Sequence, residues 1–104
     1  MADVQANYDL PEAVAGDTFG PITFTVTQNG SPRNLTSATI NLKVNGSNFW
    51  VTPTQIVLTT PLSGIFTIPE QILSLAAGVY DIEIEIIFSG GEVRTYVAGT
   101  WTVI

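Results

Sequence analysis

The chain of 104 residues has no cysteine, no histidine and only three basic residues. Without cysteine it cannot form disulfides, thiolate metal sites or a cysteine nucleophile. Without histidine it lacks the commonest general base and the commonest metal ligand, and a histidine-based catalytic triad cannot form within one chain. We therefore expect a protein that is not an enzyme and that holds no cofactor and no metal.

Positive charge is scarce. The chain has three basic residues, Arg33, Lys43 and Arg94, and nine carboxylates, which gives a formal net charge of −6. Nucleic acids and anionic membrane surfaces attract clustered lysine and arginine, so we expect neither as a partner. No run of about 18 apolar residues is present, so no membrane-spanning helix is predicted. The first residues lack the basic and apolar regions of a signal peptide, so we expect no signal peptide. Because the chain has no cysteine, we expect it to fold in a reducing cytosol.

Alternation of apolar and acidic residues is the clearest pattern in the chain and runs from Val79 to Phe88. A period of two predicts a half-buried antiparallel strand, with apolar side chains on one face and acidic side chains on the other. Shorter segments rich in β-branched and aromatic residues are separated by glycine, proline and asparagine, which favour turns. These further predicted strands span residues 8–11, 22–27, 38–44, 55–60, 64–68 and 93–103.

The connecting segments carry turn signals of their own. Asn29 and Gly30 predict a hairpin turn, and residues 89–92 predict a second one. Proline followed by an acidic residue predicts one helical turn at Pro69–Leu73. Gly99, inside the last predicted strand, predicts a bulge or a close approach of two backbones.

The spacing of Leu75, Gly78 and Tyr80 indicates a tyrosine corner, in which a tyrosine near a strand start donates its hydroxyl to backbone a few residues upstream. Gly78 is expected to give this corner its backbone freedom. Together with the strand spacing, the corner predicts an all-β fold, an immunoglobulin-like antiparallel β-sandwich of seven to eight short strands. We expect one domain over residues 8–104, preceded by a flexible lead-in, residues 1–7.

Asp81, Glu83 and Glu85 share one face of the longest alternating strand and have two interpretations. Clustered carboxylates bind Ca²⁺, whereas a solvated acidic face discourages edge pairing with other chains. Successive side chains on one face stand about 7 Å apart, too far to share an ion without ligands from a neighbouring strand, so the solvated face is favoured. A glycosidase needs a second acid across a cleft, and nothing in the sequence places one.

Aromatic residues supply the candidate contact sites. Phe49 and Trp50 lie in a loop-like region before Pro53. An exposed tryptophan there can stack on a sugar or anchor a protein partner, and the alternative is that Trp50 plugs the sandwich. Tyr96 is a third candidate for contact with a partner or ligand, whereas Trp101, within a strand, is expected in the core.

The order of the motifs is itself informative. Gly16-Asp-Thr-Phe19 precedes the strand at residues 22–27, and Asn34-Leu-Thr-Ser-Ala-Thr-Ile40 opens the next strand. Gly64-Ile-Phe66 comes before Ala77-Gly-Val-Tyr-Asp-Ile-Glu-Ile84, and residues 88–103 follow. This order resembles the immunoglobulin-like N-terminal domain of tailed-phage upper baseplate proteins and related prophage tail proteins, over residues 8–104.

The resemblance implies an immunoglobulin-like fold and a non-enzymatic virion component. Its motifs mark strands and turns, so it assigns no binding residue, and Asn34 and Ser37 stand where the pattern prefers aspartate and glycine. Family members commonly continue into a coiled coil or a receptor-binding part, which this sequence does not contain. That difference leaves a baseplate, a tail adaptor and a decoration role open.

We therefore expect a phage or prophage structural protein of the virion, assembled in the host cytoplasm. Its partners would be other virion proteins and further copies of itself in a homo-oligomer. Contacts would use sheet faces, loops or edge strands. The alternative is a carbohydrate-binding or adhesin-like β-sandwich module, in which exposed aromatic side chains bind a surface saccharide.

Overall fold

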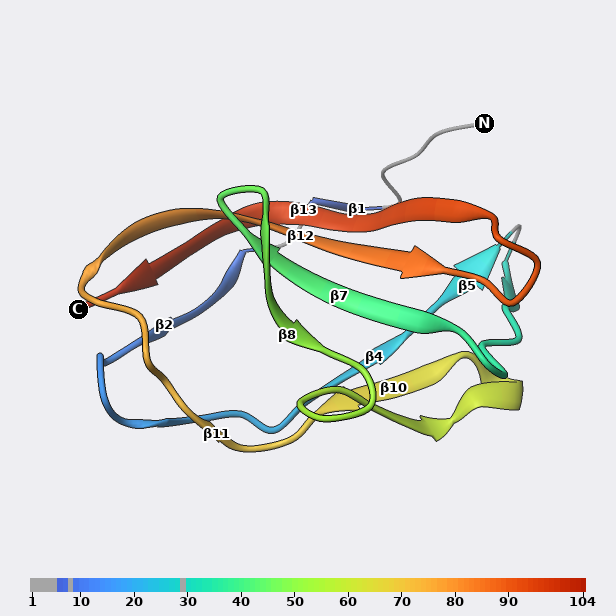
Figure 1. The fold of residues 1–104 in the computed structure, drawn as a ribbon, viewed down its shortest axis with the longest axis horizontal. Helices are drawn as coiled ribbons and strands as arrows, with labels where there is room; N and C mark the ends of the chain where they lie inside the picture. The colour runs from blue at the N-terminus through green and yellow to red at the C-terminus, as the bar shows by residue number, and fades with distance from the viewer. Residues whose placement is uncertain (1–5, 8, 29) are drawn as a thin grey trace.

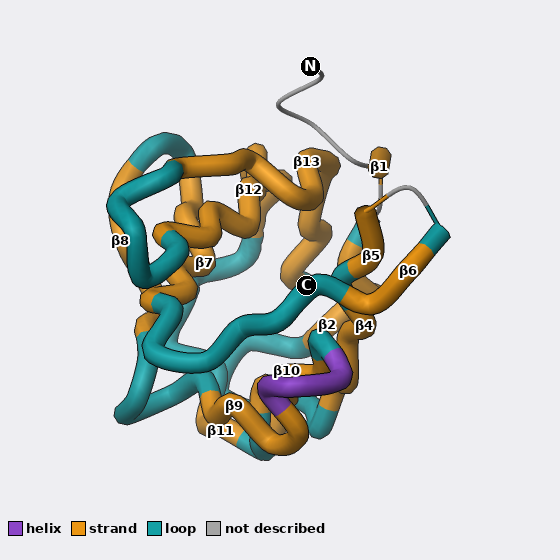
Figure 2. The backbone as a smooth tube through the Cα atoms, turned by 90° about the vertical axis from the view of Figure 1, so that its right-hand side faces the viewer, coloured by secondary structure: helices purple, strands orange, loops and turns teal. Residues whose placement is uncertain are grey.

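The computed structural model describes residues 6–7, 9–28 and 30–104, and they form a β-sandwich of two layers (Figure 1). Figure 2 views the layers nearly end on, with the larger sheet above the smaller one. The prediction of an all-β sandwich is confirmed. The strands are β1 (Ala6–Asn7), β2 (Leu10–Ala13), β3 (Thr18–Phe19), β4 (Ile22–Thr25), β5 (Thr27–Gln28), β6 (Ser31–Pro32), β7 (Thr39–Val44), β8 (Ser47–Val51), β9 (Val57–Thr60), β10 (Ile65–Ile68), β11 (Gln71–Ile72), β12 (Gly78–Ile87) and β13 (Val93–Val103), with the 3₁₀ turn η1 (Pro61–Ser63).

The strand order is that of an immunoglobulin sandwich. The larger sheet has the order β1-β13-β12-β7-β8, and the smaller sheet has the order β4-β10-β9. Strands β4, β10 and β9 thus take the places of B, E and D, while β7, β12 and β13 take those of C, F and G. The first strand departs from the constant-type pattern, because β1 and β2 both join β13 of the larger sheet, and both run parallel to it.

The N-terminal segment differs from its prediction. The sequence predicts a flexible lead-in over residues 1–7. For Ala6 and Asn7 this prediction is wrong, because their backbone pairs with β13. The strand predicted at residues 8–11 lies slightly later, at β2, and includes Pro11. Proline fits there because β2 is an edge strand. Residues 1–5, Tyr8 and Asn29 lie outside the described residues.

The alternating pattern of the longest predicted strand is confirmed in β12. Ile82, Ile84 and Ile86 are buried between the sheets, whereas Asp81 and Glu83 are exposed. The same core includes buried residues of both sheets: Leu10, Phe19, Leu35, Ile40, Leu42, Trp50, Ile56, Phe66, Ile68, Leu73, Val97, Trp101 and Val103. Burial of this one face accounts for the register of β12 against β7 and β13.

The tyrosine of the predicted corner makes the expected bond. Tyr80 Oη donates to the carbonyl oxygen of Ala76 at 2.6 Å, and Leu75 packs half-buried against the core. The role given to Gly78 is wrong. Its φ lies outside the left-handed region, and a Cβ there would stand 3.7 Å from the Tyr80 ring, which is an ordinary contact. The corner therefore has room for a side chain at this glycine.

Two local predictions differ from the structure. Where a helical turn is predicted at Pro69–Leu73, the structure has the extended strand β11, which pairs with β3. The extended backbone lets Leu73 reach the core, so tertiary packing overrides the local helix signal. For Gly99 the sequence predicts a bulge or a close approach of two backbones, and the bulge lies three residues earlier, at Tyr96. In the described part of the chain, no helix is long and apolar enough to cross a membrane.

Candidate functional site

Phe49 and Trp50 lie in strand β8 and not in a loop. Trp50 is only 5 % exposed and pairs with Leu42 of β7. Its ring centroid lies 5.5 Å from that of Trp101, in an edge-on arrangement. Phe49 is half-buried on the same cluster, 4.9 Å from Trp50. Of the two interpretations of Trp50, the exposed contact residue is wrong and the buried one is confirmed, because β8 adds to the sheet edge and turns this ring into the core.

Tyr96 owes its position to a β-bulge. Ile84 and Glu85 of β12 pair with Val97 and Thr95 of β13, so Tyr96 is the extra residue between them. A bulge redirects the side chain that it carries. The Tyr96 hydroxyl reaches the opposite sheet and donates to the carbonyl oxygen of Thr25 at 2.5 Å. Burial raises the pKa of Tyr96, and its hydroxyl proton is already engaged in joining the two sheets.

Two of the three basic residues meet at one end of the sandwich. We call this end, formed by residues 30–38, 61–64 and 88–94, the loop end. Glu92 bridges both arginines there, since one carboxylate oxygen contacts Arg33 and the other lies 2.7 Å from Arg94 Nη2. We call Arg33, Glu92 and Arg94 the arginine cluster.

The charge state of the cluster is set by its geometry. The pKa of the Glu92 carboxyl lies below its ordinary value, first because Arg33 donates a hydrogen bond to it. The positive charges of Arg33 and Arg94 act in the same direction, while burial opposes them. Glu92 is therefore ionised at neutral pH, and the cluster carries two positive charges against one negative charge.

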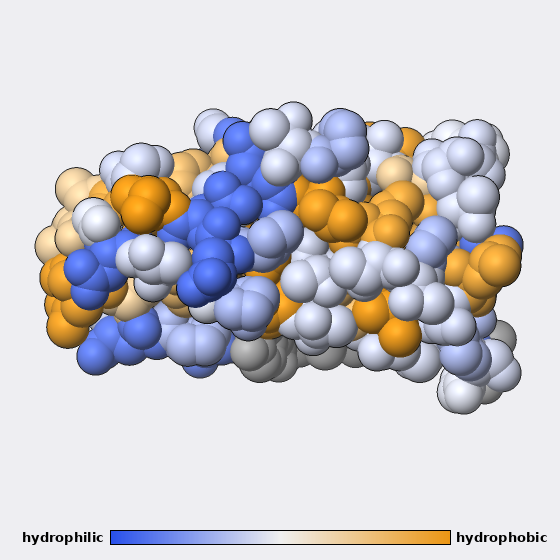
Figure 3. Space-filling model, turned by 90° about the horizontal axis from the view of Figure 1, so that it is seen from below, coloured by the Kyte–Doolittle hydropathy of each residue, from blue (hydrophilic) through white to orange (hydrophobic). Residues whose placement is uncertain are grey.

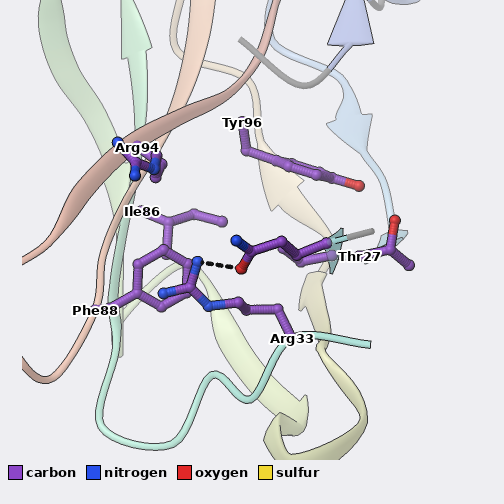
Figure 4. A pocket seen from close by; sticks show the side chains of 8 residues that line it. Thr27, Arg33, Ile86, Phe88, Arg94 and Tyr96 are labelled. Atoms are coloured by element: carbon purple, nitrogen blue, oxygen red, sulfur yellow. Dashed lines mark hydrogen bonds between the residues drawn. The ribbon is translucent and has the colours of Figure 1, made fainter. Parts of the chain in front are cut away.

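Arg33 is held on several sides, as Figure 4 shows. Its Nη1 donates to Gln28 Oε1 at 2.7 Å, and its Cζ lies 3.8 Å above the centroid of the Phe88 ring. A guanidinium over an aromatic face is attracted by the ring quadrupole. Its backbone N–H also donates to the carbonyl of Val26 at 2.9 Å. The guanidinium is thus fixed in position before any partner arrives.

The predicted turn at residues 89–92 positions Glu92. Phe88 N–H donates to the Glu92 carbonyl and Gly91 N–H to the Phe88 carbonyl, both at 2.8 Å. Gly91 has a φ of 92°, which glycine adopts without strain. The turn closes tightly enough to bring the Glu92 carboxylate back to Arg33.

A small cavity lies beside the cluster, between the two sheets (Figure 4). Its lining comes from the larger sheet, from β5 and from the adjoining loops: Val26, Thr27, Gln28, Arg33, Ile86, Phe88, Arg94 and Tyr96. Its volume is about 20 Å³, which is room for a single water molecule. An open hollow of about 420 Å³ lies outside it, lined by Arg33, Asn34, Thr36, Ser37, Phe88, Ser89, Gly90 and Glu92. A partner of any size would contact this outer hollow and not the inner cavity.

The acidic face of β12 has a different role from a cation site. Glu85 is half-buried, 3.2 Å from Lys43 Nζ, and it accepts a hydrogen bond from Asn41 Nδ2 at 3.2 Å. Asp81 and Glu83 point to solvent. Within residues 6–7, 9–28 and 30–104, no group of three or more acidic side chains lies close enough together to hold a metal ion. The arrangement is a solvated face with one ion pair between strands.

The opposite end of the sandwich is apolar. We call this end, formed by residues 14–17, residues 72–79 and Ile104, the corner end. Ala15 N–H donates to the Ile104 carbonyl at 2.9 Å and holds the two segments together. Figure 3 shows hydrophobic surface interleaved with hydrophilic surface at the left-hand end, which is the corner end, and further hydrophobic surface along the rest of this face. Its exposed large apolar side chains, named the corner patch, are Val14, Ile72, Val79 and Ile104.

No model of a known protein family matches the chain, and no curated protein matches it. The functional argument therefore depends on the two ends of the sandwich.

Sequence reasoning found neither end. Arg33 and Glu92 are 59 positions apart, and nothing local in either segment points to the other. One signal was present, because the few basic residues include two that flank predicted turns. The corner patch gave no signal, since each of its members is an isolated apolar residue that resembles a core position.

Proposed function

We propose that this chain is a non-enzymatic structural protein of a phage or prophage particle, a baseplate, tail adaptor or decoration component that acts through protein–protein contacts. The observation that carries this proposal is the corner patch, whose large apolar side chains are exposed on segments that meet at one end of a small sandwich. Gathered apolar surface favours a protein contact, whereas scattered apolar residues are ordinary.

The phage assignment draws its support from the order of the motifs between residues 16 and 103, which resembles upper baseplate and prophage tail proteins. The resemblance implies an immunoglobulin-like fold, and the strand order of the two sheets fits such a fold. The proposed partners are other virion proteins and further copies of the chain. The proposed place of action is the virion, after assembly in the host cytoplasm.

A saccharide-binding role fits the structure less well. Trp50 is buried, and Phe49 and Tyr96 are half-buried. The cavity beside Tyr96 is smaller than a sugar ring, at about 20 Å³. Flat stacking on an exposed aromatic ring, the usual basis of sugar binding, has no obvious platform among these three residues.

The test is to locate the chain in particles. Antibodies against the purified chain would label phage particles induced from the source strain and separated on a density gradient. We expect the chain to sediment with tailed particles in a fixed ratio and to be labelled on their surface. A chain found only in the soluble fractions contradicts the proposal, and a saturable fluorescence response to one member of a sugar panel would then favour the saccharide-binding module.

A further inference from the structure

The outer hollow of the loop end has the size of a small-ligand site. Its volume is about 420 Å³, within the range of about 300–1,000 Å³ that such sites commonly have. Polar side chains make up most of its wall, and they come from the segments 33–37 and 88–92. Phe88 adds an aromatic ring, but it is 9 % exposed and the Arg33 guanidinium lies over its face. A ligand in the hollow therefore meets hydrogen-bonding groups and not a stacking surface.

The opposite charges on the wall of the hollow are already paired. Arg33 and Glu92 both line it, and they form an ion pair with each other. Arg94 holds the second carboxylate oxygen of Glu92 from outside the lining. An anion in the hollow would compete with Glu92 for the guanidinium, and a cation would compete with the arginines for the carboxylate. The hollow therefore favours a ligand that carries no charge.

Hydrogen-bonding groups of both kinds remain open on this wall. The Arg33 guanidinium has further N–H groups that bond to no described residue. Asn34 Oδ1 accepts from the backbone N–H and the hydroxyl of Thr36, at 2.9 and 2.6 Å, which leaves the Asn34 NH₂ group as a donor. The exposed hydroxyls of Ser37 and Ser89 can each donate and accept. A ligand rich in hydroxyl groups matches this mixture, because every hydroxyl is both a donor and an acceptor.

Ser37 occupies the wall of the hollow in a strained conformation. Its φ is 62°, in the left-handed region, where a residue with a Cβ is disfavoured. Asn45 also has a positive φ, at 50°, but asparagine tolerates this conformation, and its Oδ1 accepts from the Asp81 N–H at 2.9 Å. The Ser37 side chain makes no such bond within the described part of the chain. Strained residues are concentrated at ligand sites, and the strain here places a hydroxyl-bearing residue on the wall.

We propose that the outer hollow binds a neutral saccharide through hydrogen bonds. Hydroxyl groups of the sugar accept from the Arg33 and Asn34 N–H groups and exchange hydrogen bonds with Ser37 and Ser89. This mode of binding needs no exposed aromatic ring. Because the hollow is open and much of the ligand stays in water, we expect weak binding, with a Kd of about 1 mM. The inference goes beyond the proposed function and does not depend on it.

The test is a titration of the isotope-labelled full chain with saccharides, followed by the backbone amide signals in two-dimensional NMR spectra. The neutral panel is glucose, galactose, mannose, rhamnose and N-acetylglucosamine, each up to about 50 mM. We expect at least one of these sugars to give saturable shifts in the segments 33–37 and 88–92 and none at the corner end. Glucuronic acid and glucosamine are charged analogues, and both should bind at least about threefold more weakly than the best neutral sugar.

Two substitutions on the wall separate the site from the fold. Gly90→Gln adds a side chain where a Cβ meets nothing within 4 Å, so it should weaken binding about tenfold or more and leave the urea midpoint unchanged. Gly78→Gln is the matched control at the corner end, where a Cβ also fits, and it should bind as the wild type does. Ser37→Gly removes the hydroxyl and relieves the strain, so binding should weaken about fivefold while the urea midpoint does not fall. Ser47→Ala removes an exposed hydroxyl outside the hollow and should change nothing.

Several results would overturn the inference. A panel without one saturable shift removes it, as do shifts confined to residues outside the loop end. Tighter binding of either charged analogue contradicts the neutral ligand, and a Gly90→Gln chain that binds as the wild type does places the sugar elsewhere. The labelling of particles tests the proposed function separately. A chain that is present in particles and binds no sugar disproves only the saccharide site, whereas a chain that binds sugar in the hollow and is absent from particles disproves only the virion role.

Discussion

Replacement of Gly64 by alanine should destabilise the fold by about 2–5 kcal/mol, above the usual effect of a single substitution. Gly64 follows η1 and has a φ of 74°. A Cβ built on it would lie 2.5 Å from the carbonyl oxygen of Val26 and 2.9 Å from that of Arg33. Both obstacles are backbone atoms, which a rotamer change cannot move aside.

The magnitude comes from two contributions. The left-handed backbone costs an alanine about 1–2 kcal/mol. To relieve the contact, the backbone must also shift. The shift weakens two backbone hydrogen bonds, from Val26 N–H to the Gly64 carbonyl at 2.7 Å and from Arg33 N–H to the Val26 carbonyl at 2.9 Å. Each weakened bond costs about 0.5–1.5 kcal/mol, and more where a buried group is left without a partner.

Gly46 provides the matched control. Its φ is 85°, almost the same conformation, but a Cβ there would meet nothing within 4 Å. Gly46→Ala should therefore lose only the backbone contribution, about 1–2 kcal/mol. The free energy of unfolding is measured by urea titration, followed by tryptophan fluorescence. Losses that agree within about 0.5 kcal/mol for the two variants would refute the steric argument, since only the close contact distinguishes the sites.

Three smaller predictions concern the corner, the arginine cluster and the core. Tyr80→Phe removes an exposed bond to Ala76, so the urea midpoint should report a loss of about 0.5–1 kcal/mol, and an unchanged midpoint contradicts it. Glu92→Gln should destabilise at pH 7. Because the folded state lowers the pKa of Glu92, the difference from wild type should shrink as the pH falls below about 4.3 and through the folded value, and a constant difference contradicts it. Trp50 and Trp101 are buried, so iodide should quench them weakly until urea unfolds the chain, and equal quenching in both states contradicts their burial.

Much of the fold could be predicted because two neighbouring strands alternate strictly. In β7 and β12 the apolar positions recur every second residue, and one buried face determines both that the strand forms and how it pairs. β8 could not be predicted this way. Its aromatic residues are adjacent and not alternating, and its strand character comes from pairing with β7, a contact that the local sequence does not contain.

The candidate site was less accessible to prediction than the fold. Tyr96 could be singled out as an aromatic residue, but its direction depends on the bulge, and the bulge is a property of how β13 pairs with β12. Burial of Trp50 followed from the same kind of long-range pairing. Turn chemistry was more informative, because the turn before Glu92 was correctly placed from Gly90 and Gly91.

The side chains of the loop end are fixed by contacts between segments that lie far apart in the sequence. Tyr96 reaches across the sheets to Thr25, and Glu92 fixes both arginines from one turn. Gly64 lets the backbone pack closely against Val26. A surface whose charged groups are already fixed loses little conformational entropy on binding.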